Sequence, residues 1–478
     1  MDNPTRTTTP ETARRWLKLS VFSLILAGLF SIVLVAGRTP PLDQRLPDAD
    51  LFKRSLVVHV NLAFMVWFYA FLGVLVHVVR ADRQSRKCDA LGLGSAVLGI
   101  SLIIAVPFVT WAPTVLSNYI PVVDHSLFLV GLAAFFASLI PGLWTLFRSG
   151  IAAGTPDWIP TATRHGVRAA AIAYLLAMLT FAVAARVTPA GLPADARYEF
   201  LFWGGGHVLQ FANVAAMTAC WFLLLGRALG REPIPPRVAA VLYAIFLLPL
   251  SLAPIWTAQG TDTGLHRVLF TRLMQFGIFP FVLVLLGLCI HAIHRERKNG
   301  FDLAAAWREP WLRGFAASAG LSVAGFVFGA AIRGSTTVIP AHYHASIGAV
   351  TVAYMATSYL LLTNWGRLPM TGTIRRVAAW QPSIYGFGQV VFALGFGLAG
   401  MQGLARKTYG VEQHVRTLTE KVGLGIMATG GMFAVAGGVL FLWIMARAHG
   451  TSRARRGVQP IGRAKWRLKA LTGILFKG

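Results

Sequence analysis

Two histidines separated by one residue open a long apolar segment, in the run IPAHYHAS over residues 339–346. Successive residues of an α-helix are rotated by about 100°, so His342 and His344 would point about 200° apart and face opposite sides of one helix. Each could therefore hold a different planar cofactor. Ligating side chains inside a hydrocarbon layer are costly and usually mark function. The alternative is that both imidazoles simply hydrogen-bond at a helix start, and the other histidines must decide between the two.

The chain that positions these histidines is strongly apolar. It has 478 residues, of which 55% are hydrophobic and 13% charged, and its mean hydropathy is +0.61. Apolar runs of about 20 residues recur, which is the length that a helix needs to cross a bilayer and is too long for barrel strands. We expect an all-α polytopic membrane protein with twelve transmembrane helices, at residues 16–36, 54–79, 91–112, 123–148, 165–187, 200–227, 236–257, 267–293, 311–332, 340–364, 383–403 and 421–446.

The basic residues predict the orientation of these spans. The termini and the loops after even-numbered spans hold 31 of the 44 lysines and arginines. By the positive-inside rule both termini are cytoplasmic, and the protein is an integral protein of a bacterial-type inner membrane. We expect a cytoplasmic N-terminus at 1–15, one transmembrane domain at 16–446, and a basic cytoplasmic tail at 447–478 that contacts anionic lipid.

The same distribution bears on partners. The net charge of +26 is spread over short loops between spans, which indicates membrane topology and no nucleic-acid partner. Three cysteines without paired spacing, and no C-x-x-C-H motif, argue against disulfides and covalently attached haem.

Five histidines from four spans are predicted to lie at one depth. His59 falls in the outer third of span two, His207 in the outer third of span six, and His266 at the outer junction of spans seven and eight. His342 and His344 begin span ten from the same side. Random placement would scatter histidines over both faces, so this pattern predicts a haem or metal layer near the outer surface.

With these residues placed, the chain resembles the catalytic subunit I of the haem–copper oxidase superfamily, which includes nitric oxide reductases. The resemblance covers essentially the whole chain and rests on the order of the histidines and on the H-x-H of span ten. It implies that His59 and His344 are axial ligands of a low-spin haem and that His342 binds a high-spin haem. It further implies that His207 is one ligand of a non-haem metal, copper or iron.

The chain departs from the family at the remaining metal ligands. Where the family has an adjacent histidine pair, the sequence reads Leu265-His266. Asp262 lies four residues before His266, so a helical turn there would place both on one face and let the carboxylate complete a His207, His266 and Asp262 set. A carboxylate suits iron as well as copper. The alternative is that Asp262 is a helix cap or a loop carboxylate paired with Arg267.

A second departure concerns the tyrosine that oxygen reductases carry four residues after the span-six histidine. That position is Phe211, which cannot donate a proton. Reduction of two NO to N2O needs only two electrons and no O–O cleavage, and nitric oxide reductases resemble this pattern. The chain is therefore interpreted as the catalytic subunit of a respiratory oxidoreductase that reduces NO, with His207, His266 and His342 at the reaction site. Reduction of O2 to water, as in cytochrome c oxidase, is the alternative.

Charged residues near the histidine layer suggest routes for protons and cofactor contacts. The acids in or beside spans near this layer, Asp124, Glu199 and Asp262, all lie toward the outer face, so we expect protons from outside and no pumping. By resemblance, Arg406 and Lys407 would bind haem propionates, although a solvated loop pair is the simpler alternative.

The remaining expectations concern partners and competing classes. Electrons should arrive from an outer-side subunit with a haem c or cupredoxin domain, because this chain offers neither. A twelve-span secondary transporter would instead show pseudo-symmetric halves and midplane charges. A haem-bearing assembly or sensor protein with a degenerate metal site stays open, because one histidine of the pair is missing at Leu265.

Overall fold

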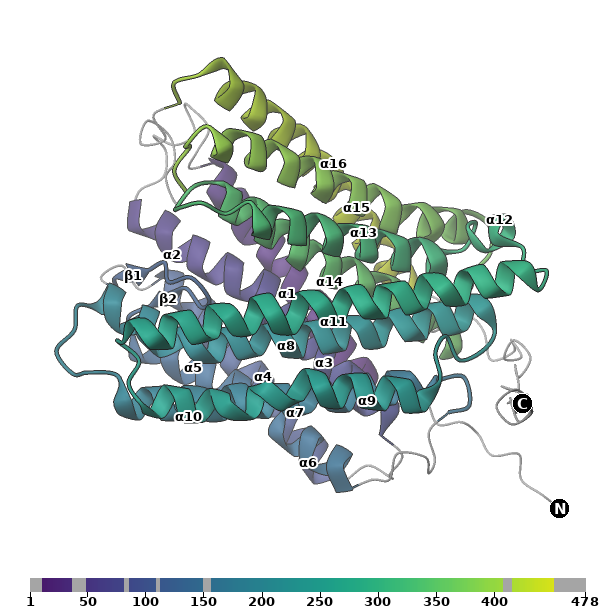
Figure 1. The fold of residues 1–478 in the computed structure, drawn as a ribbon, viewed down its shortest axis with the longest axis horizontal. Helices are drawn as coiled ribbons and strands as arrows, with labels where there is room; N and C mark the ends of the chain where they lie inside the picture. Colours follow the sequence, from purple (N-terminus) through teal and green to yellow (C-terminus); the bar gives the residue numbers. More distant parts are fainter. Residues whose placement is uncertain are drawn as a thin grey trace, which may run out of the picture.

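A computed structural model describes residues 11–36, 49–80, 86–108, 112–148, 156–406 and 415–450. Within these ranges twelve helices are long and apolar enough to cross a membrane, which confirms the predicted all-α polytopic fold. The helices run side by side along a common direction (Figure 1). The single-helix spans are α1 (Glu11–Ala36), α7 (Thr161–Val187), α8 (Ala194–Leu229), α11 (Gly264–Lys298), α13 (Pro310–Ala330), α14 (Val338–Asn364), α15 (Gly372–Met401) and α16 (Leu418–Gly450).

The other four spans are interrupted helices. Span two is α2 (Ala49–Val60), the π-helix η2 (Asn61–Val66) and α3 (Trp67–Val79), and span three is α4 (Arg86–Ala105) with η3 (Val106–Phe108). Span four is α5 (Ser126–Ala137) with α6 (Ile140–Arg148), and span seven is α9 (Pro236–Leu247), η4 (Leu248–Leu252) and α10 (Ala253–Ala258). A short helix, α12 (Leu303–Ala306), follows span eight.

Span eleven begins earlier than hydropathy predicts. The expected start was residue 383, whereas α15 begins at Gly372. Its first turns carry charged side chains, and Arg375 forms an ion pair with Glu309 just before α13. Hydropathy cannot distinguish such a polar first turn from a loop, because it scores composition and ignores pairing.

Three spans form the interior of the bundle. In each of the spans Leu51–Val79, Ala194–Leu229 and Val338–Asn364, 89% of the apolar window is buried inside the protein, against 22% for the peripheral span Leu418–Ala448. These three spans carry four of the five histidines assigned to the layer. Costly polar side chains in a membrane protein face the bundle interior, and the fold follows that rule.

A two-stranded hairpin lies at one end of the bundle. Strands β1 (Thr114–Val115) and β2 (Val122–Val123) pair antiparallel between spans three and four, with Thr114 opposite Val123. Figure 1 shows the hairpin at the left, at the end opposite α12. Its turn carries Tyr119.

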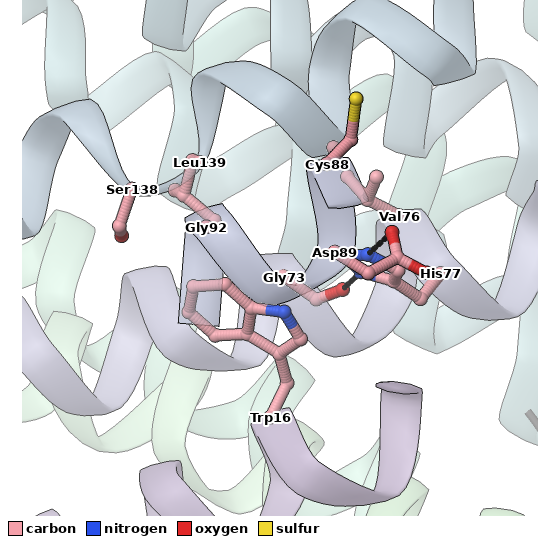
Figure 2. A pocket seen from close by; sticks show the side chains of 10 residues that line it. Trp16, Gly73, Val76, His77, Cys88, Asp89, Gly92, Ser138 and Leu139 are labelled. Atoms are coloured by element: carbon pink, nitrogen blue, oxygen red, sulfur yellow. Dashed lines mark hydrogen bonds and ion pairs between the residues drawn. The ribbon is translucent and has the colours of Figure 1, made fainter. Parts of the chain in front are cut away.

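A buried ionic cluster holds three helices together at the far end of span two. The Asp89 carboxylate of α4 accepts hydrogen bonds from Arg80 (3.1 and 3.2 Å) and from Thr12 of α1 (3.1 Å), and lies 3.3 Å from His77 Nε2 of α3. Figure 2 shows His77 beside Asp89, with the Trp16 ring nearby. His77 is buried there and links α3 to α4 through Asp89.

Candidate haem and metal site

His59 lies at the end of α2, directly before the π-helix. Its Nδ1 is 2.8 Å from the carbonyl oxygen of Ala27 on α1, so Nδ1 carries the proton and Nε2 carries the lone pair. His344 of α14 lies close enough to His59 for the two imidazoles to interact electrostatically. That these two imidazoles hold one haem stays a prediction.

The π-helical turn after His59 ties this span to the hairpin. The side-chain amide of Asn61, the first π-helical residue, donates to the carbonyls of Val57 (2.9 Å) and Pro121 (2.8 Å). A π-helical turn widens the backbone by one residue and is often found at functional sites. Here it lets one side chain hold both the histidine-bearing turn and the loop beside Tyr119.

His342 and His344 leave α14 toward different neighbours, as their spacing predicts. His342 Nδ1 lies 2.7 Å from the carbonyl of Gly325 on α13. His344 instead packs on aromatic rings of α15, with the ring of Phe392 4.5 Å away between centroids. Two planar groups bound to these imidazoles would lie on separate sides of one helix.

The donor chemistry at these positions suits haem axial ligation. His59 and His342 each give the Nδ1 proton to a backbone carbonyl, which leaves Nε2 as the basic nitrogen. Proteins orient metal-ligating histidines in this way, through a hydrogen bond from the second ring nitrogen. The residues present therefore fit the two haems that the sequence implies.

His207 of α8 makes the same backbone contact but has a further partner. Its Nδ1 lies 2.7 Å from the carbonyl of Trp203, and its Nε2 lies 2.9 Å from the hydroxyl of Tyr119. Burial, reinforced by the charge of Glu199, raises the pKa of Tyr119 far above its usual range, so the phenol keeps its proton and donates it to Nε2. The nitrogen that a metal would need is thus hydrogen-bonded to a loop tyrosine.

The glycine triplet before His207 makes room for aromatic rings. A Cβ atom at Gly204 would lie 3.0 Å from Phe270, and one at Gly205 would collide with Phe181. At Gly206 it would lie 2.5 Å from Cβ of Tyr119, so only glycine lets that ring reach His207. The triplet is explained by ring packing around the histidine.

His266 begins α11 and faces a different neighbour. Its Nε2 lies 3.4 Å from the hydroxyl of Thr257, and its Nδ1 is buried without a hydrogen-bond partner among the described residues. The Phe270 ring packs against both histidines, with ring centroids 4.7 Å from His266 and 5.8 Å from His207. The two imidazoles therefore share an aromatic neighbour.

The expected helical turn between Asp262 and His266 does not form. Thr263 is the N-cap of α11, with an extended backbone (φ −81°, ψ 146°) and a hydroxyl that accepts a hydrogen bond from the His266 amide at 3.1 Å. Asp262 precedes the cap and is exposed, because the extended cap directs the preceding chain away from the helix. Asp262 therefore does not share a helix face with His266, and the predicted helical turn between them was wrong.

The structure does not assemble the predicted three-residue metal set. In the described part of the chain, no group of three or more His, Cys, Asp or Glu residues is placed to hold a metal ion. His207, His266 and Asp262 thus do not fit a three-ligand non-haem centre as the sequence suggested.

Charged residues near the hairpin form a polar network. Arg406 donates to the side chains of Asn118 (2.8 Å) and Ser335 (3.0 Å), and the amide of Asn118 donates to Glu199 (3.0 Å). The second predicted propionate ligand, Lys407, lies outside the described residues. Arg406 is therefore oriented by neighbours at the end of the bundle that carries the hairpin.

The remaining acid near the hairpin, Asp124, is also paired. Arg197 lies 3.0 Å from its carboxylate, and the hydroxyl of Tyr198 donates to it. The adjacent His125 caps α5, where its Nδ1 accepts from the amide of Leu127 at 3.1 Å. Both residues have structural contacts.

Comparisons with known proteins agree with this arrangement of helices. The chain superimposes on the cryo-EM structure of a haem–copper terminal oxidase dimer with a TM-score of 0.70 and 16% identity, covering 96% of this chain and 86% of the other. It is 23% identical over 438 residues to cytochrome c oxidase subunit 1 of Thermus thermophilus, covering 82% and 76% of the two chains. An uncharacterised protein of Rickettsia prowazekii is 24% identical over 91% of this chain and 95% of its own length. No family model matches.

These findings define an integral membrane protein with the fold of a haem–copper oxidase subunit I, whose described residues contain twelve helices that could span a membrane. The chain resembles that catalytic subunit, but it carries Leu265 and Phe211 where the resemblance predicts a histidine and a tyrosine.

Proposed function

We propose that the chain is the catalytic subunit of a membrane oxidoreductase that binds two haems and reduces NO to N2O. The observation that carries the two-haem part is that His342 and His344 of the buried helix α14 contact different helices, α13 and α15. His59 and His344 would hold a low-spin haem, and His342 would hold the haem at which the gas reacts. When bound, haem iron supplies the one-electron redox chemistry that no side chain here can provide.

The surroundings of residue 211 support NO as the substrate. Phe211 is fully buried, packs on Phe246 with ring centroids 4.8 Å apart, and lies against Gly277 of α11. A phenol at this position would take part in O–O cleavage in the family that the chain resembles. Formation of N2O from two NO molecules requires no such group.

In this proposal, electrons and protons both reach the reaction site from the outer side of the membrane. The chain has no motif for a covalent haem, so a partner subunit with a haem c or cupredoxin domain would supply electrons near the hairpin end. Asp124 and Glu199, which hydrogen-bond in networks with Arg197 and Asn118, lie at the same end and would supply protons.

Reduction of O2 to water is a second candidate, which two findings favour. Tyr119 brings a phenol to His207 from a loop, so a proton-donating phenol is present although position 211 lacks it. The names of two similar proteins, a terminal oxidase and a cytochrome c oxidase subunit, also point to O2.

Gas consumption by the purified protein, measured with NO and with O2 in turn, separates the candidates. We expect two haems per chain and faster consumption of NO. His342→Ala should abolish turnover, whereas His291→Ala, at an exposed position far along α11, should not. Dominant O2 consumption would favour the second candidate. Haem without turnover of either gas would indicate a non-catalytic haem protein.

A further inference from the structure

A cavity of about 690 Å³ lies where α12 connects α11 to α13, at the end of the bundle opposite the hairpin (Figure 1). Its volume falls in the range of small-molecule sites. Three of its lining residues are arginines, Arg297, Arg308 and Arg313, and two are aromatic, Phe301 and Trp307. The cavity therefore combines positive charge with an apolar wall.

Arg313 is the buried member of this set. It lies in the first turn of α13, is only 8% exposed, and donates from Nε to the carbonyl of Trp307 at 2.6 Å. Its guanidinium lies over the ring of Trp380, with Cζ 4.0 Å from the ring centroid. Its Nη1 is buried and has no hydrogen-bond partner among the described residues. A buried charged donor without an acceptor is costly, so this nitrogen indicates an anionic ligand.

The acids close to Arg313 in sequence have other partners. Glu309 forms an ion pair with Arg375 of α15. Asp302 is the N-cap of α12, where its carboxylate accepts a hydrogen bond from the amide of Ala305 at 2.9 Å. Asp302 also lines the cavity, so an anion there would meet one carboxylate and three guanidinium groups. The cavity keeps a net positive charge.

The side of α13 that carries Arg313 continues as an apolar surface. Gly320 and Val327 follow Arg313 by seven and fourteen residues, so the helical repeat places all three on one side of α13. Gly320 and Val327 are exposed, and in a bilayer such a surface contacts acyl chains. Trp307 and Trp380 are also exposed, and tryptophan is enriched where a membrane meets water. The cavity therefore lies at the level of lipid headgroups, beside a surface for lipid chains.

We propose that this cavity binds the phosphate headgroup of an anionic phospholipid, with Arg313 as its buried ligand. A guanidinium can offer two parallel N–H donors to two phosphate oxygens. Arg297 and Arg308, which are exposed, add positive charge, and basic pockets between transmembrane helices favour anionic headgroups. Free phosphate would use the same donors but would gain nothing from the apolar side of α13. Lipid binding here is independent of the proposed gas reduction.

Native mass spectrometry of the purified full-length protein, titrated with phosphatidylglycerol in detergent, tests the proposal. We expect one phosphatidylglycerol to bind about tenfold more tightly than phosphatidylcholine, whose headgroup has no net charge. Arg313→Gln should weaken binding of this lipid about tenfold, because a buried charged donor is lost. Arg308→Gln, at an exposed position, should weaken it about fivefold. Excess inorganic phosphate should not displace the lipid.

Arg237→Gln is the matched control. Arg237 is an exposed arginine in the first turn of α9 and does not line the cavity. The substitution removes the same charge as Arg308→Gln, but the affinity for phosphatidylglycerol should be unchanged.

Several outcomes would overturn the proposal. These are equal affinity for the two lipids, unchanged affinity in the cavity variants, and an equal loss in Arg237→Gln, which would mean that the lipid responds only to overall charge. Displacement by inorganic phosphate would overturn the lipid assignment in favour of a free anion. The wild-type selectivity and the exposed Arg308→Gln variant decide the matter even if Arg313→Gln does not fold. Absence of haem or of gas turnover in the wild type would refute the proposed function and leave the lipid result unaffected.

Discussion

Replacing Gly206 by alanine should disturb the contact between Tyr119 and His207. The added Cβ would lie 2.5 Å from Cβ and 2.8 Å from Cδ1 of Tyr119, closer than two such carbons can approach. Gly206 is buried inside α8, so the helix cannot easily shift. The ring must move, and its hydrogen bond to His207 must lengthen or break.

The expected cost can be estimated from these contacts. Overpacking a close-packed interior costs about 1–3 kcal/mol. Loss of the 2.9 Å hydrogen bond adds about 1 kcal/mol. Alanine regains about 1 kcal/mol over glycine through helix propensity. The net loss in the free energy of unfolding should therefore be about 1–3 kcal/mol.

A double-mutant cycle with Tyr119→Gly isolates this clash. Removing the ring together with its Cβ, which would lie 2.5 Å from the new methyl group, leaves space for that group. The double variant should therefore be more stable than the sum of the single variants predicts, by about 2–4 kcal/mol, because the clash and the lost hydrogen bond are counted only once. Unfolding in detergent, followed by circular dichroism, provides the measurement. Gly287→Ala on α11, where no atom lies within 4 Å of the added Cβ, is the control and should be neutral or slightly stabilising. Additive effects, or equal stability of Gly206→Ala and the control, would refute the close approach.

Four further variants probe the cofactor sites and the ionic cluster. Replacing His59 or His344 by alanine should remove the low-spin haem spectrum and about half of the total haem, measured as the pyridine haemochrome, whereas His291→Ala should remove none. Arg406→Gln should lower the midpoint potential of one haem by about 40 mV, because a nearby positive charge worth about 1 kcal/mol favours the reduced form; an unchanged redox titration would argue against propionate binding. Asp89→Asn should lower the free energy of unfolding by about 3–5 kcal/mol, because it leaves Arg80 and its neighbours buried without a counter-charge. An unchanged haem spectrum in this variant would confirm that the effect is structural.

The spans and the positions of the span histidines could be predicted because they depend on local sequence. A bilayer imposes a minimum apolar length, and position within a span gives depth directly. The separation of His342 and His344 follows from the helical repeat alone, and in the structure they contact different helices, α13 and α15. The residue at which a helix begins, such as Gly372 for α15, was less predictable. A charged first turn can be helical when its side chains form ion pairs with residues distant in sequence.

The surroundings of His207 could not be predicted in the same way. Tyr119 lies in an irregular turn far from His207 in sequence, and no periodic pattern places such a residue. The only sequence signal was the glycine triplet, which indicates a close approach without naming the partner. The prediction that Asp262 shares a helix face with His266 was wrong for a related reason. It required a helical turn, which the N-cap at Thr263 prevents.

Proton and electron entry from one side has a consequence that vesicles can test. Asp124 and Glu199 both hydrogen-bond at the end of the bundle that carries the hairpin, where the predicted donor subunit would also dock. If both charges enter there, turnover moves no net charge across the membrane. Reconstituted vesicles with the donor outside should show no membrane potential during turnover, and the external medium should become more alkaline as protons are consumed. Acidification of the external medium would indicate pumping, and alkalinisation of the interior would indicate an inner proton route; either result would contradict a one-sided supply.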